Sequence, residues 1–219
     1  MDAQVKLKPE LKIIREEEIP HLLIPSEMGA VLELIVRDKD GKVTDHRIVR
    51  SKSFVQQFLQ LLFVRMAVSP DSAPISIRDI INTPRNVFCR YVGPDDNLLD
   101  VTAAATVVTN GIIIGTGSTA PTISDYQIGT IIPHATMNYS AMTFGAPAAD
   151  ATTSQITLTR NFANVSGASV TVNEIALYCK AWYASAFGNF MLIRDVIAGG
   201  IAVPNGQTLT VNYREQAVV

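Results

Sequence analysis

The chain has 219 residues, of which 47% are hydrophobic and 17% charged, and its formal net charge is −2. This length suits one large β domain, and the balance of 18 basic and 20 acidic residues argues against a nucleic-acid-binding protein, which would carry a clustered basic face. Soluble domains carry about 25% charged residues, so much of this surface must consist of small uncharged side chains. Such a surface favours a protein that packs against other subunits.

Residues 1–25 are predicted to form an arm that precedes the folded domain. Prolines at positions 9, 20 and 25 prevent a continuous helix. The arm is expected either to lie extended across a neighbouring subunit or to be a tail without fixed structure. The segment has no apolar core typical of a signal peptide, which predicts a protein made in the cytoplasm. The residues expected to bind a partner are Leu22, Leu23 and Ile24.

Residues 26–219 are predicted to form a single β domain that opens with a hairpin. The strand-like runs 29–38 and 43–50 flank Asp40 and Gly41. An Asp-Gly pair between two such runs is a strong hairpin signal, because glycine accepts the positive φ of a tight turn.

One amphipathic helix is expected near residues 52–67. Ser51 or Ser53 can cap its amino end. At helical spacing, one face collects Phe54, Phe58, Leu61, Leu62 and Met66, and Gln56, Gln57 and Gln60 lie away from it. The helix is therefore expected to cover an open end or face of the β core.

Beyond Pro70 the chain consists of short β-prone runs separated by Gly, Pro and Asn turns. This pattern predicts a mainly β fold, a jelly-roll-like β-sandwich, with long loops between 101 and 154. Two segments alternate apolar and polar residues most clearly and are expected to be half-buried strands. The predicted strands are 85–92, 100–108, 111–117, 154–162, 169–179, 189–197 and 207–215.

A glycine-rich phrase, Gly115 to Ala120, spells the G-x-G-x-x-A form of a dinucleotide fingerprint. That motif requires a helix directly after it and an acidic residue about 20 positions later. Pro121 follows instead, and residues 131–142 contain no acid. The phrase therefore favours a glycine-rich β turn, and no cofactor is expected.

The metal-ligand and thiol residues are dispersed along the chain. His21, His46 and His134 lie far apart, whereas zinc needs about four converging ligands. Cys89 and Cys179 belong to no C-x-x-C pair, so free thiols are favoured over a disulfide between two strands, which the sequence leaves open. No metal site is expected.

Carboxylates and aromatic residues leave two further alternatives. A pair of acids could serve glycoside hydrolysis, although structural roles in turns and caps are the favoured interpretation. A cluster of aromatic residues around Gly188 is interpreted as core, with an exposed carbohydrate or partner patch as the alternative. The acids are Asp79, Asp100, Asp125, Glu174 and Asp195; the aromatic residues are Trp182, Tyr183, Phe187 and Phe190.

Three stretches of the chain resemble structural proteins of tailed-bacteriophage particles. They are the helix segment 51–63, the phrase G-T-G-x-x-x-P-x-x-x-D-Y in residues 115–126, and a carboxyl-terminal strand pair whose turn reads Pro-Asn-Gly. The matching positions are Gly115, Thr116, Gly117, Pro121, Asp125, Tyr126, Arg194, Asp195, Pro204, Asn205 and Gly206.

This resemblance implies a non-enzymatic β-sandwich subunit of the virion. The leading hypothesis is a capsid-associated decoration or minor capsid protein that binds copies of itself, as in a trimer, and the major capsid or tail proteins. A tail or fibre protein that binds a host surface through loops 117–150 is the alternative within the virion. A cellular carboxylate-based hydrolase is the alternative of another class. Neither nucleic acid nor a membrane is expected as a partner.

Overall fold

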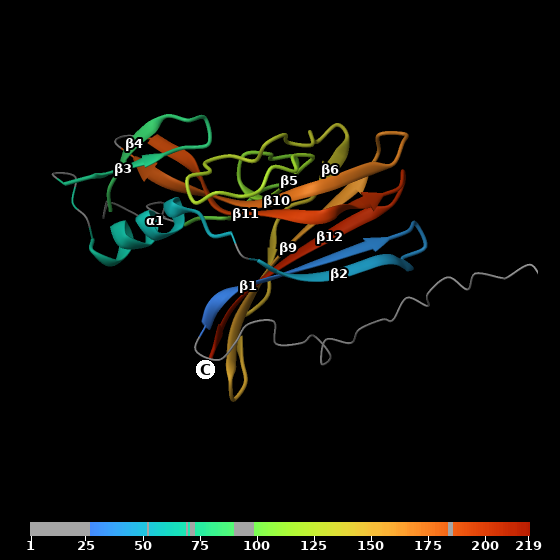
Figure 1. The fold of residues 1–219 in the computed structure, drawn as a ribbon, viewed down its shortest axis with the longest axis horizontal. Helices are drawn as coiled ribbons and strands as arrows, with labels where there is room; N and C mark the ends of the chain where they lie inside the picture. The colour runs from blue at the N-terminus through green and yellow to red at the C-terminus, as the bar shows by residue number, and fades with distance from the viewer. Residues whose placement is uncertain (1–26, 52, 69, 71–72, 90–98, 184–185) are drawn as a thin grey trace, which may run out of the picture.

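The computed structural model describes residues 27–51, 53–68, 70, 73–89, 99–183 and 186–219. Its strands form two curled antiparallel sheets, and the described residues contain one α-helix, α1 (Gln56–Met66), at one end of the molecule (Figure 1). The prediction of a mainly β sandwich with a single helix is confirmed. The predicted arm 1–25, with its partner-binding trio, lies outside the described residues.

Each sheet is built around long strands that pair with antiparallel neighbours. The first sheet has the order β2 (Val43–Ser51), β1 (Glu27–Arg37), β12 (Thr208–Val218), β9 (Thr153–Asn164) and β6 (Met137–Tyr139), and β7 (Thr143–Phe144) and β8 (Ala148–Ala149) also pair with β9. The second has the order β11 (Ala186–Val203), β10 (Val170–Tyr183), β4 (Pro84–Val87) and β3 (Ile75–Arg78), and β5 (Gly111–Gly115) also pairs with β10. We call them sheet A and sheet B.

The expected hairpin joins β1 to β2. Gly41 has a φ of +81°, and the Asp38 carboxylate accepts hydrogen bonds from the N–H groups of Asp40 and Lys42. Glycine fits this position because a side chain strains a residue at positive φ. The turn that joins β11 to β12 uses Gly206 in the same way, at a φ of +78°.

The core lies between the two sheets and follows the predicted alternation. On β12 the side chains of Leu209, Val211 and Tyr213 are fully buried, whereas Thr208 and Thr210 are half-buried on the other face. Fully burying one such apolar side chain contributes about 1.5–3 kcal/mol. Sheet B supplies the opposing layer, mainly from β5, β10 and β11.

The helix differs from its prediction in start and in orientation. It begins after Val55, which makes no side-chain cap, while Ser51 ends β2 and Ser53 precedes the helix. Gln57, Leu61 and Val64 are its buried residues, and Met66 is 75% exposed. The reason is tertiary: the chain before the helix pairs with β11, since the Val55 N–H donates to the Leu192 carbonyl, and this contact fixes which face points inward.

The predicted strand 100–108 is wrong. Apart from Asp100, which forms an isolated bridge with Lys180 of β10, this segment is irregular. Ala104 and Val107 accept hydrogen bonds from the guanidinium of Arg160 instead. The long loops predicted between 101 and 154 are present, interrupted only by β5 and by short strands.

Both cysteines are free thiols. Cys179 lies fully buried in β10, and burial raises the pKa of its thiol, with the nearby Asp100 carboxylate acting in the same direction. Cys89 is half-buried just after β4. The disulfide that the sequence left open is therefore not formed.

Candidate functional site

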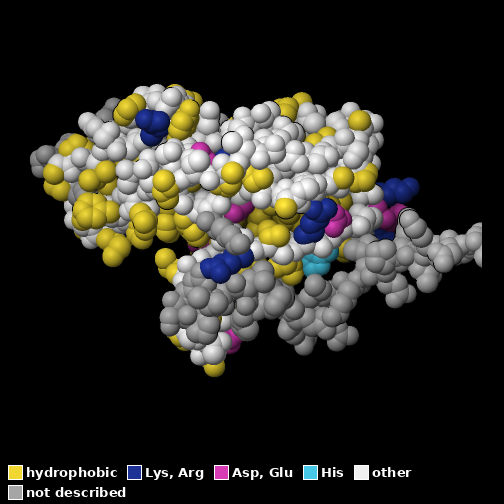
Figure 2. Space-filling view, in the orientation of Figure 1, with side chains coloured by type: hydrophobic (Ala, Val, Ile, Leu, Met, Phe, Trp, Pro, Cys, Tyr) yellow, Lys and Arg dark blue, Asp and Glu magenta, His cyan; other side chains and the backbone are white. Residues whose placement is uncertain are grey.

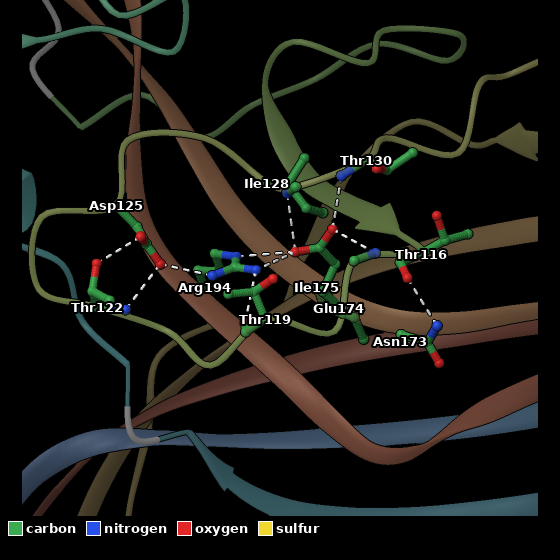
Figure 3. A network of polar contacts seen from close by, with 12 residues as sticks. Thr116, Thr119, Thr122, Asp125, Ile128, Thr130, Asn173, Glu174, Ile175 and Arg194 are labelled. Atoms are coloured by element: carbon green, nitrogen blue, oxygen red, sulfur yellow. Dashed lines mark hydrogen bonds and ion pairs between the residues drawn. The ribbon is translucent and has the colours of Figure 1, made fainter.

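A buried ionic network organises one face of the sandwich (Figure 3). Its centre is Glu174 on β10, whose side chain is fully buried although charged residues are rarely enclosed. Arg194, on the adjacent strand β11, donates to the Glu174 carboxylate through Nε at 3.0 Å and Nη2 at 2.8 Å. A buried carboxylate needs such a partner, because removing an isolated charge from water is costly.

The same carboxylate holds a loop that lies far away in the sequence. Its oxygens accept hydrogen bonds from the backbone N–H groups of Gly117, Gly129 and Thr130 at 2.8, 3.1 and 2.9 Å. The loop from Thr116 to Thr130 leaves the end of β5 and returns to it, because the Thr116 N–H donates to the Thr130 carbonyl. Glu174 therefore fixes both ends of this loop, which we call the pinned loop.

Arg194 fixes the middle of the pinned loop. Its Nη1 donates to Asp125 at 2.7 Å, and its Nη2 donates to the Thr119 carbonyl at 3.1 Å. Thr122 closes the local turn, since its N–H and hydroxyl both donate to the Asp125 carboxylate. The network thus leaves the loop little freedom to change shape.

The glycines of the phrase at residues 115–126 have a physical reason. A Cβ added to Gly117 would lie 2.2 Å from Oε1 of Glu174, and one added to Gly115 would lie 2.5 Å from the Thr130 carbonyl oxygen. Both distances are below contact limits, so only glycine lets the backbone approach the Glu174 carboxylate at position 117 and the Thr130 carbonyl at position 115. The phrase forms the end of β5 and an irregular loop anchored by Glu174, so the predicted β turn at 115–120 is wrong; the turn in this loop lies at Thr122–Asp125. Arg194 and Asp125, which also carry the resemblance to tailed-bacteriophage structural proteins, form an ion pair with each other.

Replacing Asp125 by Asn is expected to lower the free energy of unfolding at neutral pH and to flatten its pH dependence in acid. Burial alone would raise the pKa of Asp125, but hydrogen bonds from Thr122 and Arg194 outweigh it and hold the pKa below its ordinary value of 3.8. Because the folded carboxyl has the lower pKa, its contribution is full above 3.8 and is lost as the pH falls through the folded value.

The check is urea unfolding of wild type and Asp125→Asn from about pH 7 to about pH 3, where the two curves should converge. Asp40→Asn serves as the control, since Asp40 lies exposed in the β1–β2 turn. A gap between wild type and Asp125→Asn that stays constant into acid would contradict the prediction.

The pinned loop presents small uncharged side chains to solvent and continues into an apolar part of α1. Ser118, Thr119, Ala120, Thr122, Ile123 and Ser124 are exposed. The Gln56 N–H donates to the Ile123 carbonyl, which places Ile123 beside the first turn of α1. Three residues at helical spacing on α1 are exposed and apolar, and with Ile123 they define the apolar stripe: Leu59, Phe63 and Met66.

Exposed apolar side chains gather on the α1 end of the molecule, as Figure 2 shows, and few charged side chains interrupt this view of the surface. Single exposed apolar residues are normal, but a rigid patch of them indicates an interaction surface. The pinned loop and the apolar stripe together are the candidate site. The apolar stripe was not predicted from the sequence, because the helical spacing placed Met66 on the buried face.

The other candidate acids have structural partners. Asp79 accepts hydrogen bonds from the N–H groups of Ile81 and Thr83 and pairs with Arg85, while Asp195 accepts one from the Tyr213 hydroxyl. Asp100 caps its own turn through the Thr102 N–H and hydroxyl. Glu174 and Asp125 share Arg194, and the burial of Glu174 prevents contact with a substrate.

The histidines do not converge. His46 lies 3.0 Å from the Glu33 carboxylate, whereas Nδ1 of His134 accepts the Tyr139 N–H. His21 lies outside the described residues. Over the described ranges, no three His, Cys, Asp or Glu side chains are placed to hold a metal ion, and no helix is long and apolar enough to span a membrane.

The aromatic cluster divides into core and surface. Phe190 is fully buried, whereas Phe187 is exposed and packs edge-on against the half-buried Trp182, with ring centroids 4.9 Å apart. Tyr183 stacks beneath the guanidinium of Arg85. The core interpretation therefore holds for Phe190, whereas a carbohydrate or partner patch at Phe187 stays a prediction.

Comparisons with known proteins add no family assignment. The chain matches no protein-family model, no curated protein and no solved structure.

Proposed function

We propose that this chain is a non-enzymatic virion subunit, associated with the capsid, that acts by binding copies of itself and neighbouring coat proteins. The observation that carries the proposal is the distribution of charge. Seven charged residues are buried among the described residues of a chain already poor in charge: Glu33, Asp79, Arg160, Glu174, Arg194, Asp195 and Arg214. The surface formed by the described residues is therefore poorer in charge than their composition alone implies.

A surface poor in charge favours association, because interface cores are depleted in charged residues and no ion needs to lose its water on docking. Buried ionic networks give rigidity to the loop that carries part of this surface. A preorganised loop loses little conformational entropy when it docks, so more of the contact energy appears as affinity. The resemblance to tailed-phage structural proteins adds support from the same residues, Gly117, Asp125 and Arg194.

The mechanism is mass action on an assembled lattice. A subunit that binds only the assembled particle stabilises it by its own binding free energy. The exposed uncharged loop and the apolar stripe would face the coat, and the arm 1–25 would reach a neighbouring subunit. The protein would be made in the host cytoplasm and end in the virion.

Deleting residues 2–25 is expected to abolish incorporation while the β domain stays folded, because the described core draws on residues from Ala30 onward. Particles of the virus that encodes the chain, assembled without this protein, are mixed with purified protein, and the bound fraction is measured by sedimentation. Circular dichroism checks the fold of the deleted chain. A full-length Val165→Asp variant, altered at an exposed position after β9, is the control and should bind normally.

Normal incorporation of the deleted chain would overturn the role of the arm. A stable monomer that ignores the particles but binds host polysaccharide would favour the tail or fibre role instead. The exposed Phe187, packed on Trp182, is the feature that supports this second function, because aromatic residues enrich at binding surfaces.

A further inference from the structure

The sandwich is open at one end. There sheet A extends beyond sheet B (Figure 1). Strand alternation places Met28, Ile156 and Glu215 on the same face as the core residues Ala30, Leu158 and Tyr213. Yet Met28 is 68% exposed and Ile156 38% exposed. Residues on the inward face of a sheet are normally covered, so this end lacks a covering layer within the described chain.

The segment before α1 turns this open end into a groove. Phe54 and Phe58 form one wall, with their ring centroids 4.8 Å apart, and the ends of β1, β9 and β12 form the other. The groove has a volume of about 200 Å³ and a mostly apolar lining. In Figure 2 the outline of the molecule is hollowed between the α1 end and the projecting end of sheet A.

We propose that this groove binds residues 20–25 of a second copy of the chain, with Leu22, Leu23 and Ile24 seated in it. The inference rests on the proposed function, because it names the seat of the arm on the neighbouring subunit. Three consecutive aliphatic residues match a short apolar groove. Pro20 and Pro25 fix their own φ angles and favour an extended backbone at Ile19 and Ile24, which reduces the entropy lost on binding.

The polar edge of the groove also fits this segment. Burial raises the pKa of the Glu215 carboxyl, so this group would gain from a hydrogen-bond donor or a cation. His21 directly precedes the aliphatic trio and supplies a ring N–H. An apolar peptide without such a donor would offer no hydrogen bond to the Glu215 carboxyl.

The point at which the chain enters β1 favours the arm of a second copy, rather than the chain's own arm, as the occupant of the groove. The groove lies level with Met28 and Gly29, and β1 is already paired at Glu27, opposite Val218. Only Ser26 separates Pro25 from this strand, so the chain would have to reverse at once to reach its own groove. A neighbour's segment needs no reversal.

The test uses two variants of the full chain, Leu23→Cys and Ile156→Cys, each in a Cys89→Ser background, so that the introduced cysteine is the only thiol besides the buried Cys179. Mixed under mild oxidation, they should form a disulfide-linked dimer, identified on a non-reducing gel and by mass spectrometry of the 23–156 linked peptide. Val165→Cys replaces Ile156→Cys in the control, since Val165 is exposed and lies outside the groove; its yield should be at least about tenfold lower.

Absence of the 23–156 link in the mixture would overturn the proposal. So would a Leu23→Cys/Ile156→Cys double variant that links only within one chain, because the groove would then hold its own arm. Ile156→Asp in the full chain tests whether the groove is needed for incorporation into the particle. We expect a loss of incorporation similar to that of the 2–25 deletion. If the deletion abolishes incorporation and Ile156→Asp does not, the groove assignment fails while the proposed function stands.

Discussion

Replacing Arg160 by Met is expected to lower the free energy of unfolding by on the order of 4 kcal/mol. Arg160 lies in the middle of β9 with no exposed surface. Its guanidinium donates five hydrogen bonds, at 2.7 to 3.2 Å, to the carbonyl groups of Ser140, Asn110, Ile112, Ala104 and Val107. Several of these carbonyls belong to irregular segments without a strand neighbour.

Burial lowers the pKa of Arg160 to about 10, while the nearby Tyr139 acts in the opposite direction, so the side chain stays charged at neutral pH. Methionine fills most of the space but donates nothing, and the buried carbonyls would lose their partners without gaining water. A loss of this size is a large part of the 5–15 kcal/mol that stabilises a typical domain.

The urea midpoint of unfolding measures this effect, with Arg47→Met as the matched control. Arg47 also donates to a backbone carbonyl, that of Gly200 at 2.7 Å, but its side chain is 35% exposed. Water can replace that hydrogen bond, so the control should change stability by about 1 kcal/mol or less. Equal midpoints for Arg160→Met and wild type would contradict the prediction, because the segments that Arg160 binds would then be stable without its hydrogen bonds.

Replacing Glu174 by Gln is the second large effect, expected to cost about 3–5 kcal/mol, because it leaves the buried Arg194 with only one carboxylate partner. The amide also turns an N–H₂ group toward backbone N–H groups that previously met an oxygen. The loss should be local as well as global. Hydrogen exchange at the amides of Gly117, Gly129 and Thr130 should therefore accelerate more than exchange in β12.

Glu215→Gln is the control for this variant. It is the same substitution at a carboxyl whose pKa is raised by burial, so removing the charge should not lower stability at neutral pH. A double variant, Glu174→Gln with Arg194→Met, should lose less than the sum of the two single losses, because the two residues share one interaction. Additive losses, or unchanged exchange in the pinned loop, would contradict the assigned network.

Local patterns were enough to predict part of the fold. Asp40 and Gly41 specified the first hairpin through the conformation that the turn requires. The alternation of Leu209, Val211 and Tyr213 with Thr and Asn specified both the existence of β12 and the side that faces the core. In these cases the deciding pattern, a turn conformation or a two-residue alternation, extends over only a few neighbouring residues, so the sequence alone contains it.

The candidate site was decided by tertiary structure. Glu174 meets Gly117 across 57 positions, and Asp125 meets Arg194 across 69. No periodicity records which strand will lie beside which loop, so turn acids and network acids look alike in sequence. The apolar stripe of α1 could not be predicted from the sequence for the same reason. A helix with apolar residues on two sides buries the side that faces its neighbours. Here the neighbours are β11 and β3, and the buried residues are Gln57, Leu61 and Val64.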